Sequence, residues 1–126
     1  MRLLDSNIVI AAAVPEADGL RADLSTEPCA ISIVTRIEVL GFHRLSAEEE
    51  SGLREFLSRV ETHALDDAVA ARGIALRQQR KMGLGDAIIA ATALVHGLTL
   101  VTRNVDDFKH VAGLEIINPF ANRESV

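Results

Sequence analysis

The sequence predicts one α/β domain over residues 1–126, with a central, mainly parallel five-stranded sheet flanked by helices in three layers. Short apolar runs alternate with longer segments of helical periodicity, which is typical of a chain wound around a parallel sheet. The length of 126 residues is that of one ordinary domain. The sequence contains no repeat, linker or low-complexity stretch that would indicate a second one.

Five short apolar runs are the predicted strands, because aliphatic and β-branched residues bounded by polar or glycine-containing segments favour extended structure. They are residues 2–5, 29–33, 62–65, 98–102 and 115–117. Gly97 and Gly113 come just before the last two runs, and a glycine in that place is typical of a helix C-cap. We therefore expect a helix to end before each of these two strands.

Helical periodicity fills the segments between the strands. The clearest helix runs from Ser46 to about Val60, because its apolar residues recur at helical spacing and Ser46 with Glu49 forms a capping box. The other predicted helices are residues 6–14, 35–42, 66–80 and 85–96. The last of these is almost wholly apolar, as expected for a helix that packs against a sheet.

Composition excludes several classes of protein. A hydrophobic fraction of 48% and a charged fraction of 25% are those of a folded globular chain. No apolar run approaches the ~20 residues that cross a bilayer, and Asp5 comes too early for a signal peptide, so we expect a cytoplasmic protein with no membrane partner. The lone Cys29 cannot form an internal disulfide, and the four histidines show no zinc-binding spacing.

The formal net charge of −5 argues against a protein that wraps nucleic acid with general positive charge. It does not exclude a nuclease. Carboxylates that hold a divalent metal present positive charge to a phosphate once the ion is bound.

Acidic residues fall where the predicted strands end and the following helices begin. Asp5 closes the first strand, Glu38 and Asp86 lie in the first turns of two helices, and Asp106 and Asp107 follow the strand at 98–102. In an open parallel sheet these positions converge on one edge, where ligands bind. The pattern therefore predicts a cleft in which three or four carboxylates meet.

Each acid also has a structural explanation. Asp5 fits an N-cap, Glu38 fits a capping box with Thr35, and Asp86 and Asp107 fit favourable positions near helix dipoles. Together, however, like charges in apolar surroundings need a cation. Oxygen ligands without His or Cys favour Mg²⁺ or Mn²⁺, whereas Arg36 and Arg103 are the alternative partners for the carboxylates.

Four segments carry a resemblance to a known family. They are Leu3-Leu4-Asp5-Ser6-Asn7, the stretch from Ile33 to Gly41 around Glu38, Leu84-Gly85-Asp86-Ala87, and Leu100-Val101-Thr102-Arg103-Asn104. In order and spacing they resemble the successive motifs of PIN-domain nucleases, specifically the VapC type of toxin. The resemblance implies a PIN-like fold and a Mg²⁺- or Mn²⁺-dependent endoribonuclease that cleaves tRNA, rRNA or mRNA. It also implies inhibition by a VapB-like antitoxin and assembly as a homodimer.

The resemblance assigns roles residue by residue. Asp5, Glu38 and Asp86 match the acidic positions, and Asp5, Asp86 and Asp107 are the expected metal ligands, with Glu38 joining them or orienting the attacking water. For the fourth position Asp107 is favoured over Asp106, and Asn104 is the neutral alternative. Ser6 or Asn7 is expected to orient a carboxylate or a phosphate oxygen, unless Ser6 only caps a helix.

Basic residues near these motifs have two interpretations. They are Arg77, Arg80, Lys81 and Arg103. They contact the RNA backbone, or they complement a helix C-terminus and cover a solvated face. The two roles are compatible.

Apolar positions in residues 9–14 and 37–42 exceed what one sheet face needs, so besides core packing we consider a dimer interface or a groove for an antitoxin helix.

Three other functions remain to be weighed. A phosphoacceptor receiver domain requires an acidic pair by the first strand and a Lys after a late one, where this chain has Thr102-Arg103. A haloacid-dehalogenase-type phosphatase requires a second Asp where Asn7 stands. A PIN-type protein that processes RNA outside a toxin system, or binds RNA without cutting it, is the third.

Overall fold

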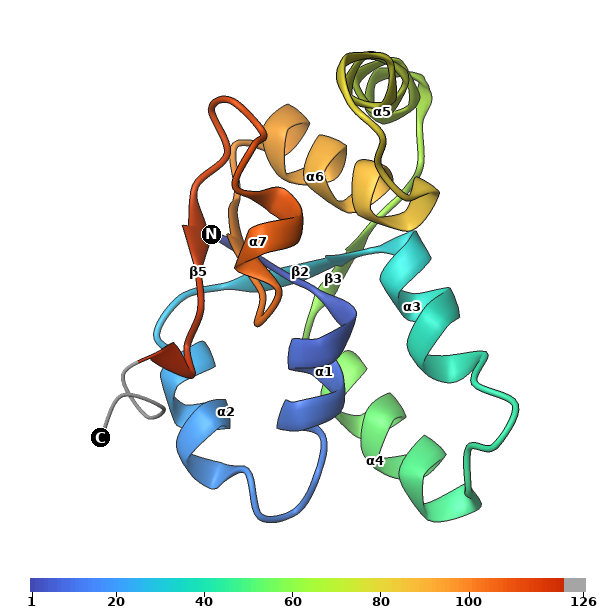
Figure 1. Cartoon of the computed structure of the whole chain (residues 1–126). Helices are drawn as coiled ribbons and strands as arrows, with labels where there is room; N and C mark the ends of the chain where they lie inside the picture. The colour runs from blue at the N-terminus through green and yellow to red at the C-terminus, as the bar shows by residue number, and fades with distance from the viewer. Residues whose placement is uncertain (122–126) are drawn as a thin grey trace.

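The sheet is central and entirely parallel in the computed structural model, which describes residues 1–121 (Figure 1). Its strands are β1 (Arg2–Leu4), β2 (Cys29–Ser32), β3 (Glu61–His63), β4 (Thr99–Val101) and β5 (Ile116–Ile117). They are arranged in the order β3-β2-β1-β4-β5. The predicted strands are confirmed, each end falling within two residues of its expected place. Residues 122–126, the end of the predicted domain, lie outside the described residues.

Seven helices accompany the strands within residues 1–121. They are α1 (Ser6–Ala12), α2 (Asp18–Leu24), α3 (Ile33–Leu40), α4 (Ala47–Leu57), α5 (Asp67–Gln79), α6 (Leu84–His96) and α7 (Val105–Phe108). The capping box of Ser46 and Glu49 is present at the start of α4. Sequence analysis missed α2 and α7, because α2 buries only Leu20 and Leu24 and α7 buries only Phe108. Helices with so few core contacts leave no periodic signal.

Helix α3 begins earlier than expected. Its N-cap is Ser32, whose hydroxyl accepts a hydrogen bond from the Val34 N–H at 3.1 Å. The strand therefore passes directly into the helix, and the predicted capping box of Thr35 and Glu38 is wrong. Thr35 is fully buried within the helix, its Oγ1 having no hydrogen-bond partner among the described residues. Glu38 lies in the second turn rather than the first.

Of the two glycines predicted to be helix C-caps, one is a cap and the other is not. Gly97 ends α6 with a left-handed φ of 66°, as expected for a C-cap. Gly113 has a φ of 80° but lies in a turn beyond the end of α7, so it shapes a loop and caps no helix. Within residues 1–121, no helix has the length and apolar character needed to span a membrane.

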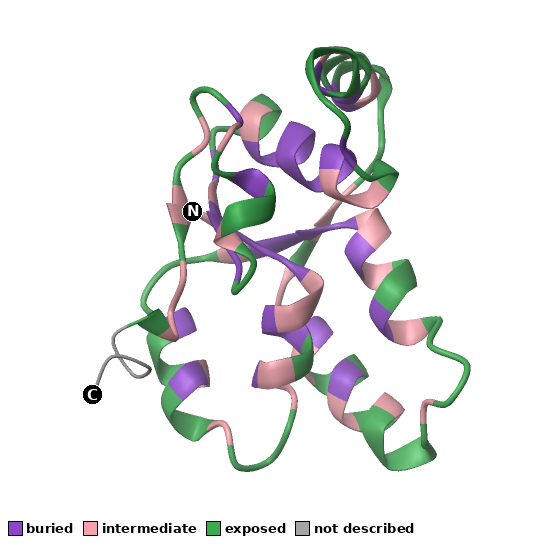
Figure 2. Cartoon of the chain, viewed as in Figure 1, coloured by how far each residue is buried: buried purple, intermediate pink, exposed green. Residues whose placement is uncertain are grey.

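Two hydrophobic clusters cover the two faces of the sheet. Leu3 and Leu4 are both completely buried but point to opposite faces, as successive strand residues do. Leu3 packs in the cluster formed with α5, α6 and α7, and Leu4 in the cluster formed with α1, α2 and α4. Figure 2 shows buried residues concentrated in the inner strands β1, β2 and β4 and along α6, while α5 lies on the outer side of α6. The structure thus confirms the three-layer α/β arrangement.

Candidate active site

The acidic residues gather where the order of the strands reverses. Strand β1 lies between β2 and β4. The strands β2 and β3 lie on one side of β1 and the strands β4 and β5 on the other, so the strand order reverses between β1 and β4. Asp5 directly follows β1, and Thr102 directly follows β4. In open parallel sheets this switch point, at the carboxyl ends of the strands, is the usual position of a ligand site.

Asp5 is the most buried of the acids, with 6% of its surface exposed. Its Oδ1 accepts a hydrogen bond from the Ser6 N–H at 2.8 Å, which makes it the N-cap of α1. Its Oδ2 accepts from the Thr102 hydroxyl at 2.8 Å and from the Asn7 amide at 3.1 Å. Three donors therefore stabilise a buried negative charge that would otherwise be costly. The capping interpretation is confirmed, and it leaves room for a second role.

Two backbone N–H groups hold the side chains that bind Asp5. The Asn7 Oδ1 accepts from the Arg103 N–H at 3.1 Å, and the Thr102 Oγ1 accepts from the Asn104 N–H at 3.0 Å. This network joins α1 to the loop between β4 and α7. Thr102 was not singled out as a site residue by the sequence, because a threonine at a strand end is ordinary and its contact with Asp5 spans 97 positions.

Glu38 approaches the same place from α3. The Ser6 hydroxyl donates to Glu38 Oε1 at 2.7 Å, so Ser6 connects Glu38 to the start of α1. Glu38 Oε2 lies 3.8 Å from where a Cβ on Gly85 would stand. The side chain therefore rests against the first turn of α6, next to Asp86.

The electrostatics of Asp86 show that the carboxylates interact. Burial is the main cause that raises the pKa of Asp86 above its ordinary value of 3.8. The charges of Asp5, Asp107 and Glu38 raise this pKa further, in that order of importance. Asp5 at the N-cap of α1 and the acids of α3, α6 and α7 thus share one electrostatic neighbourhood.

These acids do not form a preassembled metal cage. Within residues 1–121, no group of three or more His, Cys, Asp or Glu side chains is close enough to hold an ion. Among the same residues, the ion pairs that the structure shows involve acids other than Asp5, Glu38, Asp86 and Asp107. Hard oxygen donors with unbalanced negative charge nevertheless suit Mg²⁺ or Mn²⁺. The residues therefore fit such an ion by donor type and charge.

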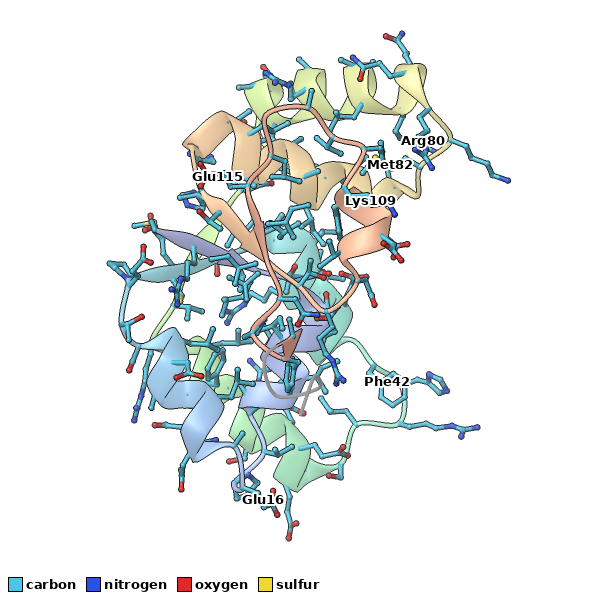
Figure 3. All side chains as sticks on the ribbon, turned by 60° about the vertical axis from the view of Figure 1, so that its left-hand side comes forward. Glu16, Phe42, Arg80, Met82, Lys109 and Glu115 are labelled. Carbon is cyan, nitrogen blue, oxygen red and sulfur yellow. The ribbon has the colours of Figure 1, made fainter. Side chains whose placement is uncertain are left out.

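The two neighbouring acids of α7 differ in their surroundings. Asp106 is 88% exposed and pairs with Lys109 Nζ at 3.0 Å. Asp107 instead acts on the pKa of Asp86. In Figure 3, Lys109 lies beside α7 at the surface. Asn104 contacts Thr102 through its backbone N–H. These contacts favour Asp107 as the fourth acid.

The candidate RNA-binding residues take up different positions. Arg77 Nε donates to the Met82 carbonyl at 3.1 Å and so stabilises the connection between α5 and α6. Arg80 and Lys81 are exposed on that connection, just before α6. Arg103 lies over the ring of Phe120, with its guanidinium carbon 4.2 Å from the ring centroid. Arg77 therefore has a structural contact of its own.

Replacing Asp86 with Asn is expected to raise the melting temperature of the metal-free protein at neutral pH. A raised pKa means that the folded state binds the Asp86 proton more tightly than the unfolded state. The resulting stability is present at acid pH and is lost as the pH rises from the ordinary carboxyl range through the raised pKa. An asparagine at this position stays neutral, so it avoids the unfavourable charge that Asp86 carries at neutral pH. Thermal unfolding in EDTA across a pH series measures the effect.

The gain in Asp86→Asn should shrink as the pH falls below the carboxyl range. Asp67, an exposed acid in the first turn of α5, supplies the control, because its charge is favourable there. Asp67→Asn should bring no gain. A melting temperature for Asp86→Asn that is no higher than that of the wild type at neutral pH would contradict the expectation.

The parallel sheet, with acids at its switch point, is that of an α/β protein with a ligand site at the carboxyl ends of its strands. The PIN domain family model matches residues 2–114. The chain belongs to the PIN domain family. It is 34% identical over 116 residues to "Ribonuclease VapC10" of Mycobacterium tuberculosis, covering 86% of each chain. A shorter match, 49% identical over 41 residues, relates it to "Ribonuclease VapC1" of Rickettsia felis and spans 32% of this chain and 31% of that protein.

Solved structures give the same relationship. A toxin-antitoxin complex from Klebsiella pneumoniae superposes with a TM-score of 0.77 at 35% identity, covering 94% of this chain and 98% of the other. VapBC2 from Rickettsia felis, bound to a DNA fragment from its promoter, gives a TM-score of 0.83 at 26% identity, covering 93% and 97%. The resemblance to VapC-type PIN domains stated from the motifs is therefore confirmed.

Proposed function

We propose that this chain is a cytoplasmic endoribonuclease dependent on Mg²⁺ or Mn²⁺, and the toxin of a VapBC-type pair. The observation that carries the proposal is the electrostatic coupling of Asp86 to three other carboxylates at the switch point of the sheet. Membership of the PIN domain family and similarity to a ribonuclease VapC support the RNA substrate.

In this proposal the side chains divide the work. Asp5, Asp86 and Asp107 would hold the ion, and Glu38, held by the Ser6 hydroxyl, would orient the attacking water. When bound, such an ion would supply a water of lowered pKa and charge stabilisation at the phosphate. Thr102 and Asn7 hold Asp5 in place. Water would form the new bond to phosphorus while the bond to the 3′-oxygen breaks and that oxygen takes up a proton, so the products would carry a 5′-phosphate and a 3′-hydroxyl.

Exposed basic residues beside the site serve the substrate in the same proposal. Arg80 and Lys81 lie on the connection that leads into α6, whose first turn carries Asp86. Together with Arg77 and Arg103 they contact phosphates of the RNA backbone, which is the usual role of arginine and lysine at nucleic-acid surfaces. These contacts would position the strand without selecting its sequence.

Cleavage of RNA by the purified chain tests the activity. With Mg²⁺ we expect products that end in a 5′-phosphate, and with EDTA no cleavage. Asp107→Asn should abolish most of the activity, whereas Asp106→Asn, its neighbour on α7, should retain it because that carboxylate pairs with Lys109. Cleavage that survives EDTA would refute metal dependence. RNA binding without any turnover in Mg²⁺ or Mn²⁺ would favour a binding-only role.

An apolar surface on α1 and α3 suits a protein partner. Val9, Ala12 and Val39 from the two predicted apolar stretches are buried, but Ile10 and Ile37 are 54% and 63% exposed. Val14 and Phe42 beyond the helix ends are also exposed, and Phe42 projects from the loop after α3 (Figure 3). We assign this surface to an antitoxin helix, the partner type of the toxin-antitoxin structures that the chain resembles. A homodimer is the second assembly we propose for the chain.

The sheet order argues against a receiver domain. A flavodoxin-like receiver places β1 between β2 and β3. Here β1 lies between β2 and β4. The remaining alternative is a PIN-domain protein that processes RNA without an antitoxin. A short upstream reading frame whose product binds and inhibits the chain would exclude it.

A further inference from the structure

The two oxygens of the Asp5 carboxylate have different surroundings. Each carboxylate oxygen offers two lone-pair positions to donors or cations. Oδ2 already accepts two hydrogen bonds, from Thr102 Oγ1 at 2.8 Å and Asn7 Nδ2 at 3.1 Å. Oδ1 accepts one, from the Ser6 N–H at 2.8 Å. Only Oδ1 therefore retains an open position for a cation.

The direction of these hydrogen bonds is fixed by the backbone. Thr102 Oγ1 accepts from the Asn104 N–H, so its single proton is directed to Asp5. Asn7 Oδ1 accepts from the Arg103 N–H, so its NH₂ group must face Asp5 and not the reverse. Thr102 cannot turn away without leaving the partly buried Asn104 N–H unpaired, which is costly. Asn7 would exchange its exposed bond from the Arg103 N–H for water.

We infer that Thr102 and Asn7 form a bracket that limits Asp5 to binding a cation through Oδ1 alone, and that this selects Mg²⁺ or Mn²⁺ over Ca²⁺. Mg²⁺ is small and requires near-octahedral geometry, whereas Ca²⁺ accepts more ligands and binds a carboxylate through one oxygen or through both, so the bracket removes a binding mode that is open to Ca²⁺. A carboxylate with one oxygen occupied by hydrogen bonds suits the smaller ion. Thr102 and Asn7 are thus positioning residues that determine metal selectivity.

The inference rests on the proposed metal-dependent function and adds the source of its ion preference. Removing the Thr102 hydroxyl opens a position on Oδ2 and releases the carboxylate to rotate. Partners that orient metal ligands typically contribute about 10–100-fold to metal affinity. Thr102→Val, which has nearly the same shape, lets Ca²⁺ bind through both oxygens of Asp5, and it should lower the Mn²⁺-to-Ca²⁺ affinity ratio by about tenfold, the lower end of that range.

Calorimetric titration of the whole chain with Mn²⁺, Mg²⁺ and Ca²⁺, in the absence of RNA, measures this ratio directly. Thr102→Ser keeps the hydroxyl and should keep the wild-type ratio. Thr99→Val on the same strand is the matched control, since its hydroxyl contacts Glu115 at 3.3 Å and not Asp5. Asn7→Ala removes the other donor and should shift the ratio in the same direction as Thr102→Val. If Thr102→Val does not fold, the Asn7→Ala variant is used for the measurement in its place.

The outcomes separate this inference from the proposed function. The bracket is supported if the Mn²⁺-to-Ca²⁺ affinity ratio is lower in Thr102→Val or Asn7→Ala than in the wild type, while Thr102→Ser keeps the wild-type ratio. An unchanged ratio, or equal losses for all three ions, overturns the bracket while leaving metal binding intact. A wild-type chain that binds none of the ions overturns the proposed function and the inference with it.

Discussion

Asp5→Asn is expected to lower kcat/KM for RNA cleavage by about a thousandfold. A catalytic ion contributes several kcal/mol of charge stabilisation in the transition state, and each 1.36 kcal/mol corresponds to a factor of ten. Asp5 is the most buried of the four acids and the one at the switch point. Its loss should therefore affect activity more than loss of any surface charge. The measurement is the rate of RNA cleavage in saturating Mg²⁺.

The same variant should still fold, at a modest cost in stability. An asparagine has one accepting oxygen, so it keeps either the cap from Ser6 or the contacts from Thr102 and Asn7, but not both. Loss of one such contact costs about 0.5–2 kcal/mol. Asp67→Asn, an exposed acid on α5, should leave activity unchanged. If Asp5→Asn kept activity within tenfold of the wild type, Asp5 would not be a metal ligand.

Phe108→Ala is expected to destabilise the fold by about 3–5 kcal/mol, the usual range for a buried Phe. Phe108 is completely buried and is the buried residue of the short helix α7. Since whole domains are stable by only about 5–15 kcal/mol, this loss takes a large share of the total. Asp107 precedes Phe108, so activity should fall even under conditions where the variant remains folded. Urea unfolding followed by circular dichroism measures the loss.

Phe42→Ala is the matched control for this prediction. Phe42 is 53% exposed, so its truncation should change the free energy of unfolding by about 0.5 kcal/mol or less. Equal losses in the two variants would mean that burial does not account for the effect. A loss below about 1 kcal/mol in Phe108→Ala would contradict the core position of α7.

Sequence patterns located the strands and the larger helices well, because their signals are local. The capping box at Ser46 and the C-cap at Gly97 involve residues within one helical turn of each other, and both are present. Helix α2 was missed because it buries only Leu20 and Leu24, which are too few to produce a periodic apolar pattern. The start of α3 was misplaced because Ser32 serves both as the end of a strand and as a helix cap.

The sequence by itself determined the α/β class, the family through its ordered motifs, and the acids at strand ends, because periodicity, capping and motif spacing are properties of neighbouring residues. Only the tertiary structure decided which partners those acids have. Asp5 meets Thr102 across 97 positions, and Glu38 meets Ser6 across 32. Such contacts depend on which strands pair, and the order β3-β2-β1-β4-β5 is fixed by packing of the whole chain. Strand pairing alone brings β4 beside β1, and with it the threonine that holds Asp5.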